Sequence, residues 1–295
     1  MKFVSWLQNI RANYKTPLPE GYSPVRVRSR RFEPIQDGQI VFHGINKSGS
    51  LALSTVLREG YKREARLNQF FSRYLSIPQH ERDFHEIIRN SSGHAFFVDH
   101  NIYGAISPAP HRALVTILRH PLPRIFSVYR WLERHHSKDF GGSMPAFIEW
   151  VRNTKGITYS QLEQFGAGYG PEMHELRKLP GDELLDRAKQ ALAKDVHCLG
   201  LAERFEETIF LFAHLCGLSA VPAWKRDDRN SDRPLVSTID KNDLDLVEEA
   251  FHWDFKLYRF AVDLFEKQLQ DVAFDTDDLG RYKLACIDEY KDRLV

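Results

Sequence analysis

A single lysine lies in a short polar loop between an apolar run and a helical pattern. Residues 40–45 read Ile-Val-Phe-His-Gly-Ile, residues 46–50 read Asn-Lys-Ser-Gly-Ser, and a helical pattern follows from Leu51. Such a loop offers a cation, small hydroxyls and backbone N–H groups at a helix N-terminus, where the helix dipole also favours negative charge. It therefore predicts a site for a phosphate-like or sulfate-like anion. Its candidate ligands are Lys47, Ser48, Gly49 and Ser50.

The loop alone allows two other interpretations. The phosphate-binding loop of NTPases needs a glycine directly before the lysine. Here Asn46 precedes Lys47 and the glycine follows, so that pattern fails. A polar turn that only caps a helix is the simpler interpretation of four residues taken by themselves.

A second candidate anion site lies in residues 113–131. An apolar run ends at Arg119, a proline-containing turn follows, and a helical pattern carries Ser127 one turn past its start. An arginine can meet a phosphate with two charge-assisted hydrogen bonds, and a serine can add a hydroxyl donor. The alternative is a strand-end arginine paired with a carboxylate and a serine on a helix surface.

The elements around these residues predict an α/β fold. The apolar runs 39–45, 94–101, 113–119 and 197–202 have strand length and lack strict alternation, which fits parallel strands covered on both faces. Helical patterns run from Leu51 to a stop at Gly60, from Pro123, over 144–152, over 184–194, up to Gly217, and over 242–270. We expect a three-layer sandwich with a central, mostly parallel sheet flanked by helices. Ligands bind such sheets at the carboxyl ends of the strands, where Lys47 and Arg119 fall.

Composition excludes several classes of protein. The 295 residues carry a net charge of +1 and no dominant basic run, so no nucleic-acid partner is expected. No stretch approaches the ~20 apolar residues of a membrane span. The cysteines are few and widely spaced, at Cys198, Cys216 and Cys286. This spacing argues against a disulfide framework and therefore favours a reducing, cytoplasmic location. This prediction of the location would not hold for a trimmed piece of a longer protein. The neighbours His135 and His136 lack metal-ligand spacing, and no metal site is expected.

The segment 113–131 closely resembles the 3′-phosphate-binding motif of the sulfotransferase superfamily. That motif is a strand, Leu-Arg-Asp-Pro, two or three residues, Arg, and then Ser-x-Tyr in the helix. Arg119 and Ser127 fall on the arginine and serine that contact the 3′-phosphate in the family. Arg124 also matches, whereas His120 replaces the usual aspartate.

Further segments extend the resemblance over about residues 39–267. The Lys-Ser-Gly-Ser loop resembles the phosphosulfate-binding loop of the family. Residues 97–104 resemble, more loosely, a segment of the carbohydrate, 2-O-sulfotransferase-like members. The remaining matches are 199–208, 229–234 and 254–258. The resemblance implies a P-loop-like fold and a sulfotransferase domain over 39–270, between an N-terminal extension (1–38) and a C-terminal tail (271–295) packed on or beside it.

The resemblance also implies a donor and its ligands. The donor would be 3′-phosphoadenosine 5′-phosphosulfate, which needs no metal. Lys47 would stabilise charge on the leaving oxygen, as a compact ammonium can. The late loop that closes over the nucleotide would supply Asn230, Ser231 and Arg233.

The acceptor hydroxyl must lose a proton, and histidine suits this task because its pKa lies near neutral. Of the thirteen histidines, His100 is the best candidate, at the end of the strand before the Arg119 strand, where the family has its catalytic histidine. A structural strand-end histidine is the alternative. Asp99 and Glu203 are weaker candidate bases. If Asp99 and His100 both lie in a strand, Asp99 should point to the opposite face of the sheet from His100.

The predicted function is sulfuryl transfer to a hydroxyl of a glycan, glycolipid or small molecule. A nucleotide or small-molecule kinase is an alternative, but the glycine before the lysine and a clear Mg²⁺-holding aspartate motif are both missing. A non-catalytic nucleotide-binding module is another alternative, and the presence of Lys47 argues against it. Neither the acceptor nor the oligomeric state follows from the sequence.

Overall fold

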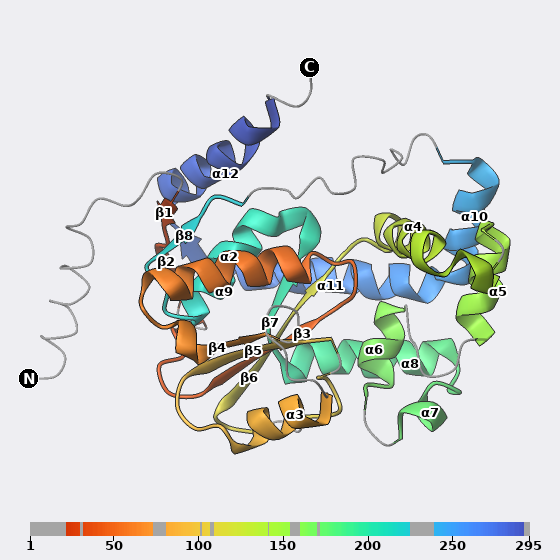
Figure 1. The fold of residues 1–295 in the computed structure, drawn as a ribbon, viewed down its shortest axis with the longest axis horizontal. Helices are drawn as coiled ribbons and strands as arrows, with labels where there is room; N and C mark the ends of the chain where they lie inside the picture. Colours follow the sequence, from red (N-terminus) through yellow and green to blue (C-terminus); the bar gives the residue numbers. More distant parts are fainter. Residues whose placement is uncertain are drawn as a thin grey trace, which may run out of the picture.

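The computed structural model describes residues 22–29, 32–72, 81–100, 102–106, 109–140, 142–153, 160–169, 172–224 and 239–291. Within them, a central sheet has five parallel strands in the order β4, β5, β3, β6, β7 (Figure 1). The strands are β3 Gln39–Gly44, β4 Phe70–Ser72, β5 Ala95–Asp99, β6 Arg112–Leu118 and β7 Val196–Leu201. The predicted α/β fold, a parallel sheet flanked by helices as in a three-layer sandwich, is confirmed.

The middle strand, β3, has β5 on one side and β6 on the other. The chain leaves β3 toward β4 and β5 and later crosses to β6 and β7, so its direction across the sheet reverses beside β3. Ligands bind open α/β sheets outside the carboxyl ends of the strands at such a reversal. The loop with Lys47 follows β3, and Arg119 follows β6. The strand β4 was not predicted, because three residues give too short an apolar run.

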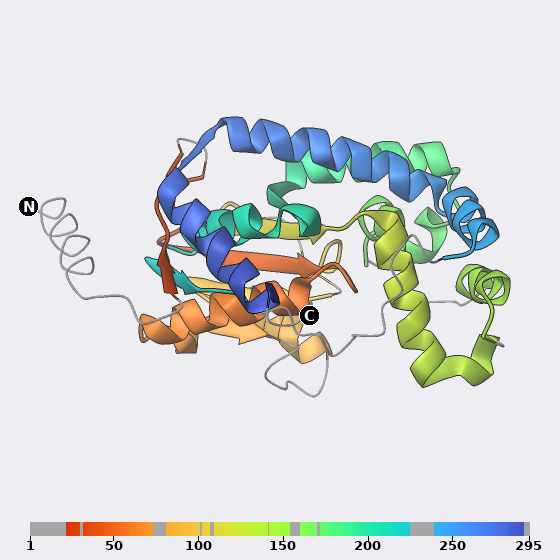
Figure 2. The same ribbon diagram turned by 90° about the horizontal axis from the view of Figure 1, so that it is seen from above.

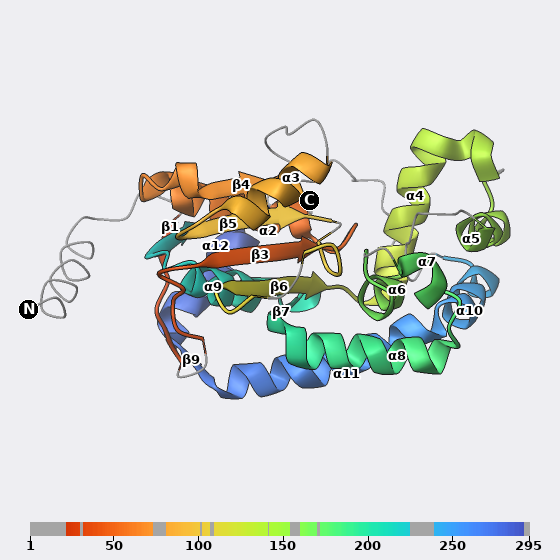
Figure 3. The same cartoon turned by 90° about the horizontal axis from the view of Figure 1, so that it is seen from below.

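Different helices cover the two faces of the sheet. Alternate residues of β3 point to opposite faces, and Phe42 belongs to the core beneath α2 (Ser50–Arg63) and α9 (Phe205–Leu215). Val41 packs on the other side, with residues of α3 (Glu81–Asn90). That face and the β7 edge also carry α6 (Gln161–Gly166), α8 (Gly181–Gln190) and α11 (His252–Gln270) (Figures 1 and 3).

A smaller group of helices lies beyond the carboxyl ends of the strands. It comprises α4 (Pro121–Phe140), α5 (Met144–Asn153) and α10 (Lys241–Ala250), which share an apolar cluster of their own (Figures 2 and 3). The helix α4 leads directly from the β6 end into this group. The residues that follow β3 and β6 therefore lie between the sheet and a helical lobe.

Several predicted helix bounds were wrong. The helix α2 passes through Gly60 and ends at Arg63. Gly60 is needed for packing, because a Cβ there would lie 2.7 Å from Cδ1 of Leu218. The predicted helix over 242–270 is two helices, since Phe251 leaves helical geometry with φ −116° between α10 and α11.

Other bounds differ by smaller amounts. The helix α4 begins at Pro121, two residues before the predicted proline. The helix α8 begins at Gly181 and continues as a π-helical turn, Ala191–Asp195. The helices predicted over 144–152 and up to Gly217 are confirmed by α5 and α9.

Segments from the two ends of the sequence pair with the rest of the chain. The strand β1 (Tyr22–Pro24) pairs with β8 (Ala220–Pro222), and β2 (Val27–Ser29) pairs with β9 (Val272–Phe274). The helix α12 (Thr276–Lys291) packs against the α9 core through Tyr282 and Cys286. The division at residues 38 and 270 stays a prediction. None of the described helices is both long and apolar enough to cross a membrane.

Candidate functional site

The loop after β3 has an unusual backbone that leaves the start of α2 without a side-chain cap. Lys47 and Gly49 have positive φ angles of 66° and 87°. The turn is closed by Ile45, whose carbonyl accepts from the N–H of Ser48 at 3.2 Å and from Oγ of Ser50 at 3.0 Å. Positive φ is uncommon and costly for a lysine, and such strained residues are enriched at functional sites. The N-cap residue of α2 is Gly49, which has no side chain to accept from the first N–H groups of the helix, and such N–H groups suit an anion.

Ser48 gives a second sign that the loop is built for a ligand. Its side chain is fully buried, and its Oγ has no hydrogen-bond partner among the described residues. An unsatisfied buried polar group costs about 1–3 kcal/mol, which a ligand oxygen could recover. Gly49 suits the loop because its φ of 87° is rarely adopted by residues with a side chain.

Two arginines from the β6 end hold the carbonyl side of this loop. Arg119 donates from Nη1 to the carbonyl of Lys47 at 3.0 Å. Arg124, from the first turn of α4, donates from Nη1 to the carbonyl of Asn46 at 3.2 Å. The structure therefore brings both predicted anion motifs to one edge of the sheet.

Arg124 is the most deeply placed cation of the site, with a side chain that is fully buried. Burial, opposed by the charge of Asp254 and aided by that of Arg119, lowers its pKa to about 10. The guanidinium is therefore still charged at neutral pH. A bound anion would add a favourable partner for this charge.

A buried amide fixes the backbone of Arg119. Oε1 of Gln161 accepts from the N–H of Arg119 at 3.0 Å, and its Nε2 donates to the carbonyl of Arg119 at 2.8 Å. Asp254 holds Gln161 in turn, accepting its N–H at 2.6 Å and the hydroxyl of Ser160 at 2.6 Å. Burial raises the pKa of Asp254, and Arg124 works against that rise. No sequence motif predicts this role of Gln161, because a lone glutamine matches no pattern.

Ser127 and Trp131 are four residues apart on α4 and so share a face of that helix. The ring of Trp131 lies 5.9 Å from Nζ of Lys47, and 41% of this residue is exposed. The shared face therefore turns Ser127 toward the loop. An exposed tryptophan beside a lysine also offers a flat surface on which a base or a sugar could stack.

His100 lies on the other side of β3, just past the end of β5. Its Nδ1 is 2.5 Å from the carbonyl of Gly44. A carbonyl only accepts, so Nδ1 carries the proton and, in the neutral ring, Nε2 carries the lone pair. This is the tautomer that a general base needs. The side chain is half-buried.

The weaker candidate bases are engaged elsewhere. Asp99 is buried, accepts from the N–H of His100 at 2.6 Å, and lies 3.7 Å from Nε2 of His85. Glu203 uses both oxygens, accepting from the N–H of His120 at 3.0 Å and from the hydroxyl of Tyr258 at 2.6 Å. The carboxylate of Asp99 is therefore enclosed beside the β5 end, whereas Glu203 is exposed but has both oxygens in hydrogen bonds.

His43 packs beneath the loop and takes no charge. It is fully buried, with its ring against Phe165, Tyr103 and Tyr169. Burial, aided by the charge of His100, lowers its pKa to about 3. A neutral ring here supports the loop without competing for the anion.

Part of the prediction lies outside the described residues. This applies to Asn230, Ser231 and Arg233, whose roles stay predictions. Among the residues that are described, no three His, Cys, Asp or Glu side chains are grouped as metal ligands.

Comparison with known proteins adds nothing to this geometry. No protein-family model matches the chain, and no curated protein matches it either. The fold defines the class, an α/β protein with a candidate anion site at the carboxyl edge of its sheet. Any narrower assignment depends on the residues of that site and on the motif resemblance.

Proposed function

We propose that this protein is a sulfotransferase that moves a sulfuryl group from 3′-phosphoadenosine 5′-phosphosulfate to an acceptor hydroxyl. The observation that carries the proposal is the meeting of the two anion motifs, through the 3.0 Å bond between Arg119 and the carbonyl of Lys47. A ligand that satisfies both motifs needs two separate anionic groups. A 3′-phosphorylated, 5′-activated nucleotide has them.

The residues of the site fit such a donor. The uncapped start of α2 and the buried hydroxyl of Ser48 suit the 5′ phosphosulfate. Arg119 and Ser127 suit the 3′-phosphate. When bound, the donor supplies the sulfuryl group and leaves as adenosine 3′,5′-bisphosphate.

Each remaining role belongs to a side chain on a defined element. Lys47, on the loop after β3, donates to the oxygen on which charge develops. His100, at the β5 end, accepts the acceptor's proton at Nε2, while its Nδ1–H is held by Gly44. Arg124 and Gln161 keep the loop and Arg119 in place.

The acceptor is a hydroxyl of a glycan, glycolipid or small molecule that must approach from the His100 side. A cytoplasmic location belongs to the same proposal. It is supported by Cys198, Cys216 and Cys286, which are buried and form no disulfide, as is usual in a reducing compartment.

Nucleotide binding separates this function from a kinase. We expect adenosine 3′,5′-bisphosphate to bind at least about tenfold more tightly than ATP with Mg²⁺ in calorimetric titration, because only the former has a 3′-phosphate for Arg119. ATP binding as tightly or more tightly would contradict the proposal. Sulfuryl transfer would then be tested with labelled donor and a panel of glycan, glycolipid and phenolic acceptors.

A further inference from the structure

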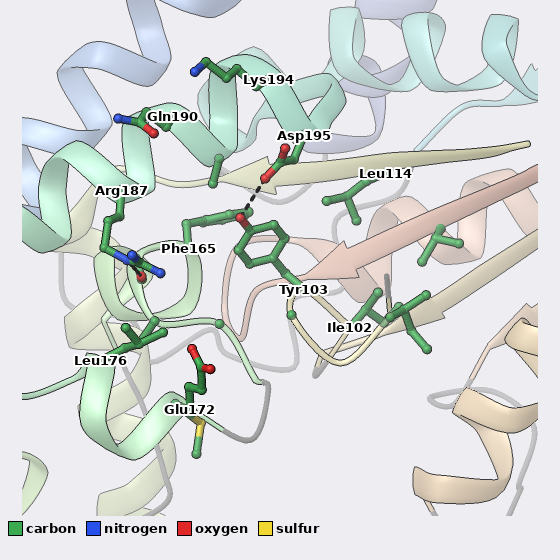
Figure 4. Close-up of a pocket in the computed structure, with 18 of the residues that line it drawn as sticks. Ile102, Tyr103, Leu114, Phe165, Glu172, Leu176, Arg187, Gln190, Lys194 and Asp195 are labelled. Carbon is green, nitrogen blue, oxygen red and sulfur yellow. Dashed lines mark hydrogen bonds between the residues drawn. The ribbon is translucent and has the colours of Figure 1, made fainter. Parts of the chain in front are cut away.

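A cavity of about 560 Å³ lies on the sheet face opposite α2 (Figure 4). Its volume is typical of small-molecule sites. Val41 of β3 and Leu114 of β6 form its floor, and Ile102 and Ile106 of the loop after β5 form one side. The other side is formed by the segment after α6, α7 (Met173–Leu176) and α8.

The cavity is separate from the candidate catalytic site. Tyr103 and Phe165 line it, and their rings also pack on the buried ring of His43, at centroid distances of 6.5 and 5.3 Å. These rings therefore stand between the cavity and the floor of the Lys47 loop. Of the described residues that line the cavity, none belongs to that loop or to α4.

The charged residues of the cavity favour an anion. Arg187 and Lys194 are seven residues apart, so they follow one side of α8 and its π-helical extension. Arg112 lines the opposite, strand end, where burial and the charge of Arg89 lower its pKa. Two carboxylates also line the cavity, and one of them, Asp195, accepts the hydroxyl of Tyr103 at 2.9 Å (Figure 4).

Arg187 is the cation best placed to take a ligand. Its Nε donates to the carbonyl of Gly166 at 2.9 Å, which fixes the side chain along the cavity wall. Among the described residues, no carboxylate forms an ion pair with its guanidinium. The guanidinium thus presents its terminal nitrogens beside an apolar floor.

We propose that this cavity binds an amphipathic anion, with an apolar body over Val41 and Leu114 and a sulfate, carboxylate or phosphate group at Arg187. Binding would be favoured by the burial of the apolar floor under the apolar body, and by charge-assisted hydrogen bonds between the head group and Arg187. This site is distinct from the nucleotide site and does not depend on the sulfuryl-transfer proposal.

Calorimetric titration of the full chain with three probes of equal chain length tests the site. The probes are decyl sulfate, decanoate and the uncharged 1-decanol. We expect both anions to bind with one site and at least about fivefold more tightly than the alcohol. Decyl sulfate and decanoate together show whether the head group must be a sulfate or only an anion.

Two variants locate the probes. Arg187→Met should weaken both anions about five- to tenfold and leave 1-decanol unchanged. Arg259→Met is the matched control, an exposed helix arginine whose Nε also donates to a backbone carbonyl, and it should change nothing. Leu176→Trp should narrow the cavity from its outer wall and weaken all three probes.

Several results would overturn the proposal. If Arg187→Met binds the two anions as tightly as the wild type does, Arg187 does not bind their head group. Displacement of decyl sulfate by saturating adenosine 3′,5′-bisphosphate would place the probe in the nucleotide site instead. Undiminished binding to Leu176→Trp, in a variant with a wild-type melting curve, would place it elsewhere on the surface.

Discussion

The two strands that flank β3 end in different ways. At the β6 end, Arg119 is held by its side chain and by both backbone groups, through the loop carbonyl and Gln161. At the β5 end, the ring of His100 is oriented through Nδ1 by the carbonyl of Gly44, and its backbone N–H donates to the buried carboxylate of Asp99. The β6 end is also backed by buried charge, from Arg124 and Asp254.

The difference suits two tasks. A permanent anion is best bound by cations that are fixed before it arrives, because binding then needs little reorganisation. A proton acceptor needs one defined tautomer and an accessible lone pair. We therefore expect changes at the β6 end to act on nucleotide affinity and changes at the β5 end to act on the rate of reaction. Lys47, between them, should affect both, with the larger effect on the rate.

The strongest test of this comparison is His100→Ala. We expect kcat to fall by ~10²–10⁴-fold, as is typical for loss of a general base, with unchanged affinity for adenosine 3′,5′-bisphosphate. The wild-type rate should fall at acidic pH as the ring is protonated, and the variant should lose that limb. His174→Ala, at an exposed histidine of α7, is the control. A near-normal kcat with an unchanged limb would move the base to Glu203 or Asp99.

Lys47→Ala probes the middle of the site. Loss of a donor to developing charge typically lowers kcat by ~10²–10³-fold, and we expect a smaller loss of nucleotide affinity. The exposed Lys62 of α2 gives the control, Lys62→Ala. A kcat within about tenfold of wild type, a change of ~1.4 kcal/mol, would be incompatible with a role at the leaving oxygen.

Arg119→Ala and Ser127→Ala probe the β6 end. We expect affinity for adenosine 3′,5′-bisphosphate to fall by ~10–100-fold for the arginine and ~2–10-fold for the serine, from the usual strengths of charged and neutral hydrogen bonds. Adenosine 5′-phosphosulfate, which lacks the 3′-phosphate, should bind nearly as before. Equal losses for both ligands would show that these residues do not bind the 3′-phosphate.

The sequence predicted the elements that follow from local pattern. Buried strands are short apolar runs, so β3, β5, β6 and β7 were found, together with the loop and the arginine that follow β3 and β6. Patterns of this kind contain no information on partners far away in the chain. The pattern predicts a helix stop at Gly60 because it does not show the close approach of Leu218, 158 positions later.

The same limit explains what the sequence missed in the site. Gln161 bonds to Arg119 across 42 positions, and Asp254, the first residue of the matched segment 254–258, bonds to Gln161 across 93 positions, a contact that the motif does not contain. Glutamine and aspartate are common on surfaces, so neither residue type signals burial. The cavity beside α8 is a product of packing between distant elements and has no local motif.

Gln161 acts on the nucleotide only through Arg119, so its loss should have a smaller effect than the loss of Arg119 itself. Gln161→Leu removes the amide that pairs with both backbone groups of Arg119. We expect affinity for adenosine 3′,5′-bisphosphate to fall about three- to tenfold, less than for Arg119→Ala, because the guanidinium remains but its position is less fixed.

The chain contains a matched control for this variant. Gln268 is also buried and pairs in the same way with both backbone groups of Leu199, at 3.0 and 2.8 Å, in β7. Both Gln161→Leu and Gln268→Leu should lower the melting temperature, since each leaves a buried peptide group without its partners. Only Gln161→Leu should change nucleotide affinity in calorimetric titration. If Gln268→Leu lowers nucleotide affinity as much as Gln161→Leu does, the effect comes from a general loosening of the sheet. The β6 end would then not be more preorganised for its ligand than the β5 end.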